Sequence, residues 1–248
     1  MPRITSILFD MDGVLCDYDF DGRLKALEAA IGIPAAEIDA KIFKSGFEDA
    51  ADLGQYGAPG YMEEVARLLD ADVDAGTWLA ARADAMTPNL EMLDLARDLK
   101  TRTDIAMFSN NGWQLREALG DIFPELTAIF GTHIYFSAEV GAGKQHTETF
   151  HPFLTQLGWS VETTLFVDDN EGYIAAARAA GVESHLFECA EGFKTALVAH
   201  SLLQGAAFQH ILVVADRRGH KVQESANACD AAEVGVGQQP KFRTDIIG

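Results

Sequence analysis

Short apolar stretches alternate with stretches of helical periodicity through most of the chain. Residues 4–9 are apolar or β-branched, with no polar alternation after Ser6, which predicts a strand that is covered on both faces. Further strands are predicted at 104–109, 132–137, 164–169 and 184–188. Amphipathic helical patterns separate the later strands. This alternation predicts an α/β fold with a Rossmann-like, parallel sheet.

A long block of helical patterns separates the first predicted strand from the second. Residues 17–87 are too many for a simple crossover between parallel strands, so we expect an inserted small helical cap domain there. Residues 1–16 and 88–203 would then form the α/β core. Within the insertion, the glycine-rich segment 45–60 is predicted to be a loop. Residues 204–248 contain glycine, glutamine and charged residues without a period, and we expect a loosely ordered tail.

The composition excludes several classes of partner. Acidic residues outnumber basic ones by 38 to 19, which gives a formal net charge of −19 and disfavours binding to nucleic acid. No apolar stretch approaches the ~20 residues that a membrane helix needs, so we expect no membrane partner. The chain begins without an apolar signal segment, and its three cysteines form no C-x-x-C pair. These features favour the cytoplasm.

Polar side chains follow three of the predicted strands at their carboxyl ends. They are Asp10 with Asp12, Ser109 with Asn110, and Asp168 with Asp169. A single aspartate in such a place often only caps the next helix, but acids that recur at two strand ends favour a ligand site. Carboxylates that converge repel one another unless a cation is present. Because the donors are all oxygen atoms, the sequence predicts a divalent metal, Mg²⁺ before others.

Four motifs in this order resemble the haloacid dehalogenase-like hydrolase superfamily. They are FDMDGVL at 9–15, FSNN at 108–111, the downstream Lys144, and FVDDN at 166–170. The resemblance covers about residues 4–200 and is to subfamily IA, which has a small helical C1 cap after the first strand. The segments DYDF at 17–20 and HIYFSAEVGAGK at 133–144 are most similar to the α-D-glucose-1-phosphatase-like branch.

The resemblance implies a catalytic role for several matched residues. Asp10 would be the nucleophile that forms an aspartyl phosphate. Asp12 would protonate the leaving alcohol and then activate water as a base. Ser109 and Asn110 would bind phosphoryl oxygens. Lys144 would neutralise the charge of the phosphoryl group and of Asp10.

The resemblance also implies the ligands of a Mg²⁺ ion. They would be Asp10, the backbone carbonyl of Asp12, and Asp169, with Asp168 beside it or acting through water. One departure from the family pattern is Tyr173, which stands near a place where the family often has Asn or Asp.

The sequence therefore predicts a Mg²⁺-dependent phosphatase that acts on a small phosphorylated metabolite such as a sugar phosphate. A phosphomutase would share the same core residues. A 2-haloacid dehalogenase would use the same nucleophile without metal, but Asp12 argues against it, because a proton must reach an alkoxide and not a halide. The remaining alternative is a non-catalytic domain that binds a phosphorylated ligand.

Overall fold

Five parallel strands form the central sheet in the computed structural model, which describes residues 3–203. Their order is β5-β4-β1-β6-β7. The strands are β1 (Ser6–Phe9), β4 (Asp104–Ser109), β5 (Ile134–Phe136), β6 (Thr164–Asp168) and β7 (Glu183–Leu186). The predicted α/β fold with a parallel sheet is confirmed, and β4 coincides with the strand predicted at 104–109.

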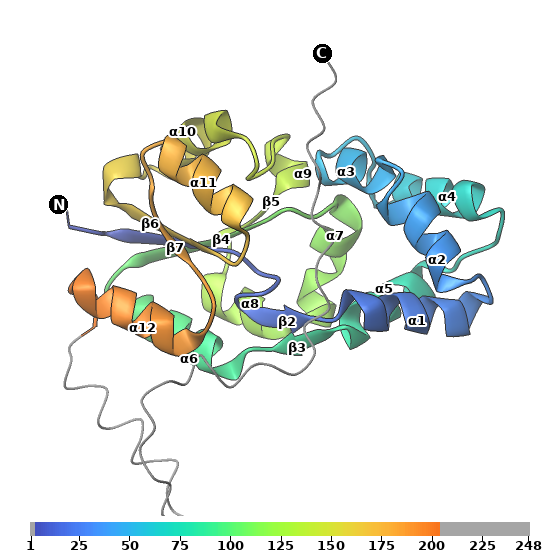
Figure 1. Cartoon of the computed structure of the whole chain (residues 1–248), viewed down its shortest axis with the longest axis horizontal. Helices are drawn as coiled ribbons and strands as arrows, with labels where there is room; N and C mark the ends of the chain where they lie inside the picture. The colour runs from blue at the N-terminus through green and yellow to red at the C-terminus, as the bar shows by residue number, and fades with distance from the viewer. Residues whose placement is uncertain (1–2, 204–248) are drawn as a thin grey trace, which may run out of the picture.

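Helices cover both faces of this sheet (Figure 1). One face packs on α10 (Thr147–Gln156) and α11 (Glu171–Ala179), and the other on α6 (Leu90–Leu99), α7 (Trp113–Ile122), α8 (Pro124–Phe130) and α12 (Ala190–Ala199). Side chains that are adjacent along β1 point to opposite faces: Leu8 lies on the face that α10 and α11 cover, and Ile7 and Phe9 lie on the other. Burial on both faces explains why this strand is apolar throughout.

A two-stranded antiparallel ribbon connects the sheet to a group of helices. Its strands, β2 (Cys16–Tyr18) and β3 (Met86–Pro88), pair Cys16 with Pro88 and Tyr18 with Met86. Between them lie α1 (Phe20–Ile31), α2 (Ala35–Ile38), the π-helical turn η1 (Asp39–Phe43), α3 (Phe47–Asp52), α4 (Ala58–Leu69) and α5 (Ala75–Asp84). We call residues 20–84 the helical insert. The domain limits expected at 17–87 stay a prediction.

The helical insert has a hydrophobic cluster of its own. Trp78 and Tyr61 are fully buried in it, and Phe43 stacks on Trp78. The prediction of a loop throughout 45–60 is wrong, because α3 forms within it. Phe47 and Ala51, one helical turn apart, are both buried, and Phe47 stacks on Tyr61. This tertiary contact outweighs the turn-forming glycines around it.

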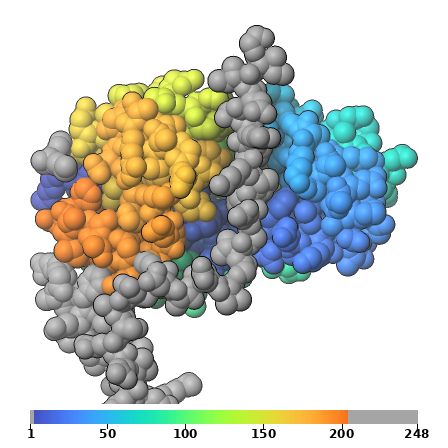
Figure 2. Space-filling view, viewed as in Figure 1, coloured from blue at the N-terminus to red at the C-terminus, as the bar shows by residue number. Residues whose placement is uncertain are grey.

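In space-filling view, the insert occupies one side of the molecule and the sheet with its helices the other (Figure 2). The tail predicted at 204–248 lies outside the described residues. Among residues 3–203, no helix combines the length and the apolar character that crossing a membrane requires.

Candidate active site

Asp10 lies directly after β1, and its backbone N–H donates to the carbonyl of Val167 on the neighbouring strand. The residue is 5% exposed, and its Oδ1 accepts a hydrogen bond of 2.7 Å from the N–H of Met11. Lys144 Nζ lies 2.6 Å from Oδ1 of Asp10 and 2.7 Å from Oδ2 of Asp168. Lys144 and Asp168 are buried as well, so one ammonium pairs with two carboxylates that are largely shielded from water.

Three predicted acids meet at the carboxyl ends of β1 and β6. Asp10, Asp168 and Asp169 each offer an oxygen, and these atoms lie within 4.8 Å of one another. Burial raises the pKa of Asp10 well above its usual value, and the charge of Asp168 raises it further. Loss of solvation, followed by the charge of Asp168, raises the pKa of Asp169 to about 6.

The net charge of this acid cluster fits a divalent cation. Three carboxylates and the Lys144 ammonium leave two negative charges when all are ionised. One divalent ion would balance them, and the all-oxygen donor set suits Mg²⁺. The donors present are therefore those that a magnesium site requires.

Gly13 allows the turn after β1 to approach this acid cluster. It has a φ of +81°, which side chains other than glycine rarely adopt. A Cβ atom at this position would lie 2.2 Å from Oδ2 of Asp169. The glycine thus provides both the left-handed turn and the space for the Asp169 carboxyl.

Asn110 holds the loop that carries Lys144. Its side-chain oxygen accepts from the N–H of Lys144 at 3.0 Å, and its amide nitrogen donates to Oε1 of Gln145 at 3.0 Å. On the other side of the loop, the hydroxyl of Thr149 donates to the carbonyl of Gly143 at 2.8 Å. The sequence predicts Asn110 as a ligand of the phosphoryl group; here both ends of its amide position the lysine loop.

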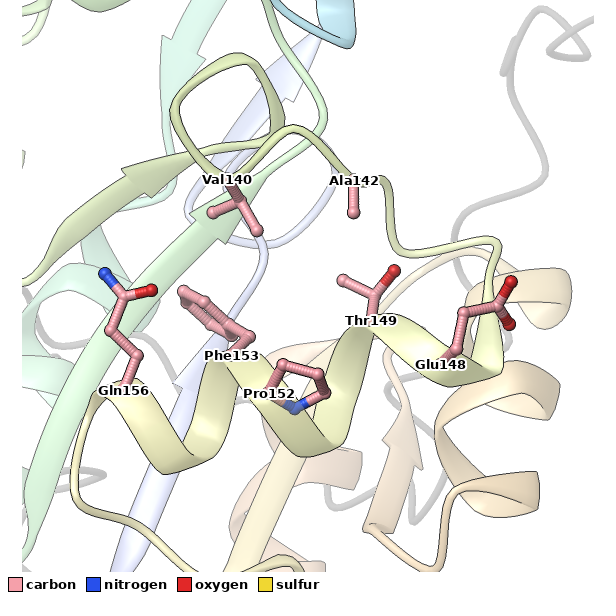
Figure 3. Close-up of a pocket in the computed structure, with 7 residues that line it drawn as sticks. All are labelled: Val140, Ala142, Glu148, Thr149, Pro152, Phe153 and Gln156. Carbon is pink, nitrogen blue, oxygen red and sulfur yellow. The ribbon is translucent and has the colours of Figure 1, made fainter.

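Thr149 also lines a surface cavity of about 180 Å³ between α10 and the segment before Lys144 (Figure 3). The other lining residues include Val140, Pro152 and Phe153, and none of the predicted site residues is among them. The cavity therefore lies outside the predicted site.

Ser109 ends β4 and is 1% exposed. Its hydroxyl accepts from Nδ2 of Asn111 at 2.8 Å, and the same nitrogen donates to Oδ2 of Asp12 at 3.2 Å. Asn111 thus links two predicted site residues. The sequence analysis predicts no role for Asn111. Its place in the FSNN motif, next to Asn110, could have marked it as a residue of the site.

The carboxylate of Asp12 contacts a residue of the helical insert instead of joining the acid cluster. Nη2 of Arg82, on α5, lies 2.7 Å from Oδ1 and 2.6 Å from Oδ2 of Asp12. Arg82 is 3% exposed, and its guanidinium stacks 3.8 Å from the centre of the Tyr18 ring. Although burial lowers it, the charge of Asp12 raises the pKa of Arg82, so the guanidinium keeps its positive charge beside Asp12.

The sequence predicts no role for Arg23, and it marks Tyr173 only as a departure from the family pattern. Arg23, on α1, donates from Nη1 to the hydroxyl of Tyr18 at 3.0 Å. Tyr173 places its ring 5.0 Å from Nζ of Lys144, in cation–π geometry. The departure from the family pattern at Tyr173 thus adds an aromatic wall beside the buried ammonium.

Comparisons with known proteins give one family and one fold. Residues 4–181 match the sequence model of a family of hydrolases described as haloacid dehalogenase-like hydrolase. A HAD-like family hydrolase from Porphyromonas gingivalis has a similar structure, with a TM-score of 0.69 and 22% identity over 82% of this chain and 100% of that chain.

Two other solved structures are similar. A HAD family enzyme from Bacteroides thetaiotaomicron, in complex with magnesium and inorganic phosphate, has a TM-score of 0.64 and 20% identity over 73% of this chain and 93% of that chain. The L-2-haloacid dehalogenase from Xanthobacter autotrophicus, with chloropropionic acid covalently bound, has a TM-score of 0.50 and 18% identity over 84% of this chain and 88% of that chain. At these low sequence identities, the structural similarity shows a shared fold alone.

Proposed function

Because the chain belongs to the haloacid dehalogenase-like hydrolases, we propose that this hydrolase is a Mg²⁺-dependent phosphatase. Its substrate would be a small phosphomonoester, hydrolysed through an aspartyl phosphate on Asp10. The observation that carries this proposal is the acid cluster, in which buried Lys144 pairs with Asp10 and Asp168 while Asp169 completes a set of converging oxygens.

In the first step, an oxygen of Asp10 attacks phosphorus and the bond to the leaving oxygen breaks. Asp12, outside the acid cluster, gives its proton to that oxygen, so that an alcohol leaves. Lys144 lies 2.6 Å from Asp10 and holds the nucleophile in place while its charge attracts the phosphoryl oxygens. The Ser109 hydroxyl is the donor for one of these oxygens.

In the second step, a water molecule attacks phosphorus and the bond to Asp10 breaks. Asp12 takes the proton of the water, which restores its starting state, and inorganic phosphate leaves. Oxygens of Asp10, Asp168 and Asp169, with the backbone carbonyl of Asp12, would hold Mg²⁺. The ion would supply positive charge to the phosphoryl oxygens.

We further propose that the helical insert is the cap over this site. Gly54 has a φ of +80°, and a Cβ there would lie 2.4 Å from the carbonyl oxygen of Ala138 in α9 (Ser137–Val140). The insert thus touches the core beside the lysine loop. Asp10 and Lys144 are almost fully buried, which suits a small metabolite such as a sugar phosphate.

The test is release of inorganic phosphate from a panel of sugar phosphates and from p-nitrophenyl phosphate, with Mg²⁺ and with EDTA. Release that needs Mg²⁺ and falls to background in Asp10→Asn is expected. The matched control is Asp104→Asn, which changes an exposed aspartate at the opposite end of β4 and should keep full activity. Borohydride reduction should convert the aspartyl phosphate to homoserine, with phosphate as the leaving group, in the peptide that contains Asp10.

Two other reactions are distinguished in the same experiment. Halide release from 2-chloropropionate without metal, with no phosphate release, would establish a dehalogenase, the activity of one structural neighbour. Conversion of one sugar phosphate into its isomer, again without phosphate release, would establish a phosphomutase. Either result would replace the phosphatase proposal.

A further inference from the structure

Arg82 contacts the carboxylate of Asp12, the proposed proton donor to the leaving group. Its Nη2 contacts both carboxylate oxygens of Asp12, so a leaving oxygen that takes the proton of Asp12 must arrive beside this nitrogen. The second terminal nitrogen, Nη1, is buried and has no hydrogen-bond partner among the described residues. A buried N–H without an acceptor is costly, and such groups are rare in folded proteins.

The guanidinium is held in this position from the side of the insert. Tyr18, on the ribbon strand β2, stacks against it at 3.8 Å and is itself held by the hydrogen bond from Arg23. The guanidinium of Arg23 lies 5.0 Å from the ring centre of Phe43 and 5.3 Å from that of Trp78. These contacts fix the plane of Arg82 independently of Asp12, so that Nη1 is a preorganised donor.

An unpartnered acceptor belongs to the same polar cluster. Oδ1 of Asp52, at the end of α3, is buried without a hydrogen-bond partner among residues 3–203. Burial raises the pKa of its carboxyl, which interacts electrostatically with Glu48 and Asp49, which raise the pKa further, and with Arg82 and Arg23, which lower it. A free donor and a free acceptor in one cluster suit hydroxyl groups, which both donate and accept, better than a second phosphate.

We propose that Arg82 bridges Asp12 and the leaving group: Nη2 positions the Asp12 carboxyl, and Nη1 donates to an oxygen of the leaving group other than the ester oxygen. This inference rests on the phosphatase function proposed above and names its substrate class, alkyl phosphates whose leaving group carries a hydroxyl close to the ester. Polyol and sugar phosphates are of this class. A leaving group without that oxygen leaves Nη1 unpaired.

Three esters separate the two contacts of Arg82. The p-nitrophenolate of p-nitrophenyl phosphate leaves without a proton, propyl phosphate needs the proton only, and glycerol 1-phosphate needs the proton and offers a neighbouring hydroxyl. In the wild-type protein, kcat/KM should be higher for the glycerol ester than for the propyl ester.

Arg82→Met should lower kcat/KM for both alkyl esters and abolish the preference for the glycerol ester, while p-nitrophenyl phosphate changes by less than about threefold. A positioned acid accelerates proton transfer by ~10²–10⁴-fold, so a loss of at least about tenfold is expected for the propyl ester. Arg82→Lys puts one ammonium nitrogen in place of the two terminal nitrogens of Arg82, and this nitrogen donates to Asp12. It should retain most activity on the propyl ester and still lose the preference for the glycerol ester.

The control is Arg67→Met, which removes an exposed arginine paired with Glu64 on α4 of the same insert. It should leave all three rates unchanged. Adding Arg82→Met to Asp12→Asn should cost little further activity on propyl phosphate, because both changes remove one proton transfer.

An equal loss on all three esters would make Arg82 structural only and overturn the inference. So would a wild-type protein that cleaves p-nitrophenyl phosphate but shows no preference for the glycerol ester. If Arg82→Met does not fold, as judged by circular dichroism, the Lys variant decides by its ratio between the two alkyl esters. Absence of Mg²⁺-dependent phosphate release from every ester in the wild-type protein would instead refute the phosphatase function.

Discussion

Lys144 is the residue whose removal most directly tests the acid cluster. The change Lys144→Met keeps the length of the side chain and removes the ammonium. Nζ lies 2.6 Å from Asp10 and 2.7 Å from Asp168, and the lysine is 1% exposed. The variant therefore leaves two buried carboxylates without their common cation.

The expected cost to the free energy of unfolding is about 3–5 kcal/mol at neutral pH in EDTA, because a buried charge that loses its partner is left uncompensated. The matched control is Lys44→Met, which breaks the more exposed pair with Asp39 and should cost at most about 1 kcal/mol. Mg²⁺ should restore part of the stability of Lys144→Met by supplying the missing charge to the carboxylates.

The loss should also depend on pH. Burial raises the pKa of Asp10 in the folded state, and removal of Lys144 raises it further. A folded carboxyl with a raised pKa binds more protons than the unfolded chain, so stability falls as pH rises through the interval between the two pKa values. The deficit of Lys144→Met should accordingly be larger at pH 8 than at pH 5.

Urea unfolding followed by circular dichroism, in EDTA and in Mg²⁺ at both pH values, measures these quantities. Phosphate release should fall to background in the same variant. If Lys144→Met were as stable as the wild-type protein at neutral pH in EDTA, or no worse than Lys44→Met, the ammonium would not be compensating the two acids. The electrostatic account of the site would then be wrong.

Three further outcomes follow from the geometry of the site. Gly13→Ala should lose Mg²⁺ binding in calorimetry, because its Cβ would overlap Asp169. The control Gly32→Ala has a similar φ of +75° and a Cβ with no atom within 4 Å, so it should only lower stability. Equal Mg²⁺ affinities in the two variants would contradict this reasoning. Gly54→Ala should raise KM by separating the insert from the core. The control Gly57→Ala, whose Cβ has no atom within 4 Å, should leave KM unchanged. An unchanged KM in both variants would refute the role of the Gly54 contact in the cap. Because the pKa of Asp169 is about 6, protonation of Asp169 should weaken Mg²⁺ binding below that pH. In the metal-free protein, the contribution of Asp169 to stability should fall as pH rises from about 4 to about 6. A Mg²⁺ affinity that stays constant between pH 5 and 8 would exclude Asp169 as a ligand.

The sheet and its acidic edge were accessible from the sequence because their signals are local. An apolar run such as residues 105–108 in β4 has no polar side to present to water, so it becomes a central strand wherever it pairs. The acids that follow β1 and β6 then meet at one edge, since both strands run in the same direction. Helix α3 shows the limit of such signals: Phe47 and Ala51 are helical because the insert's own core buries them, in a segment whose glycines indicate a loop.

The sequence by itself determined the parallel α/β fold, the family motifs and the identity of the acids, because covalent order and side-chain chemistry specify them. Only the tertiary structure decided which cation faces Asp12. Arg82 is 70 residues from Asp12 and has no motif around it, yet the insert folds back and brings its guanidinium to within 2.6 Å of that carboxylate. Ion pairs of this kind depend on how two separately packed groups of elements dock, and that docking is a property of their surfaces as a whole.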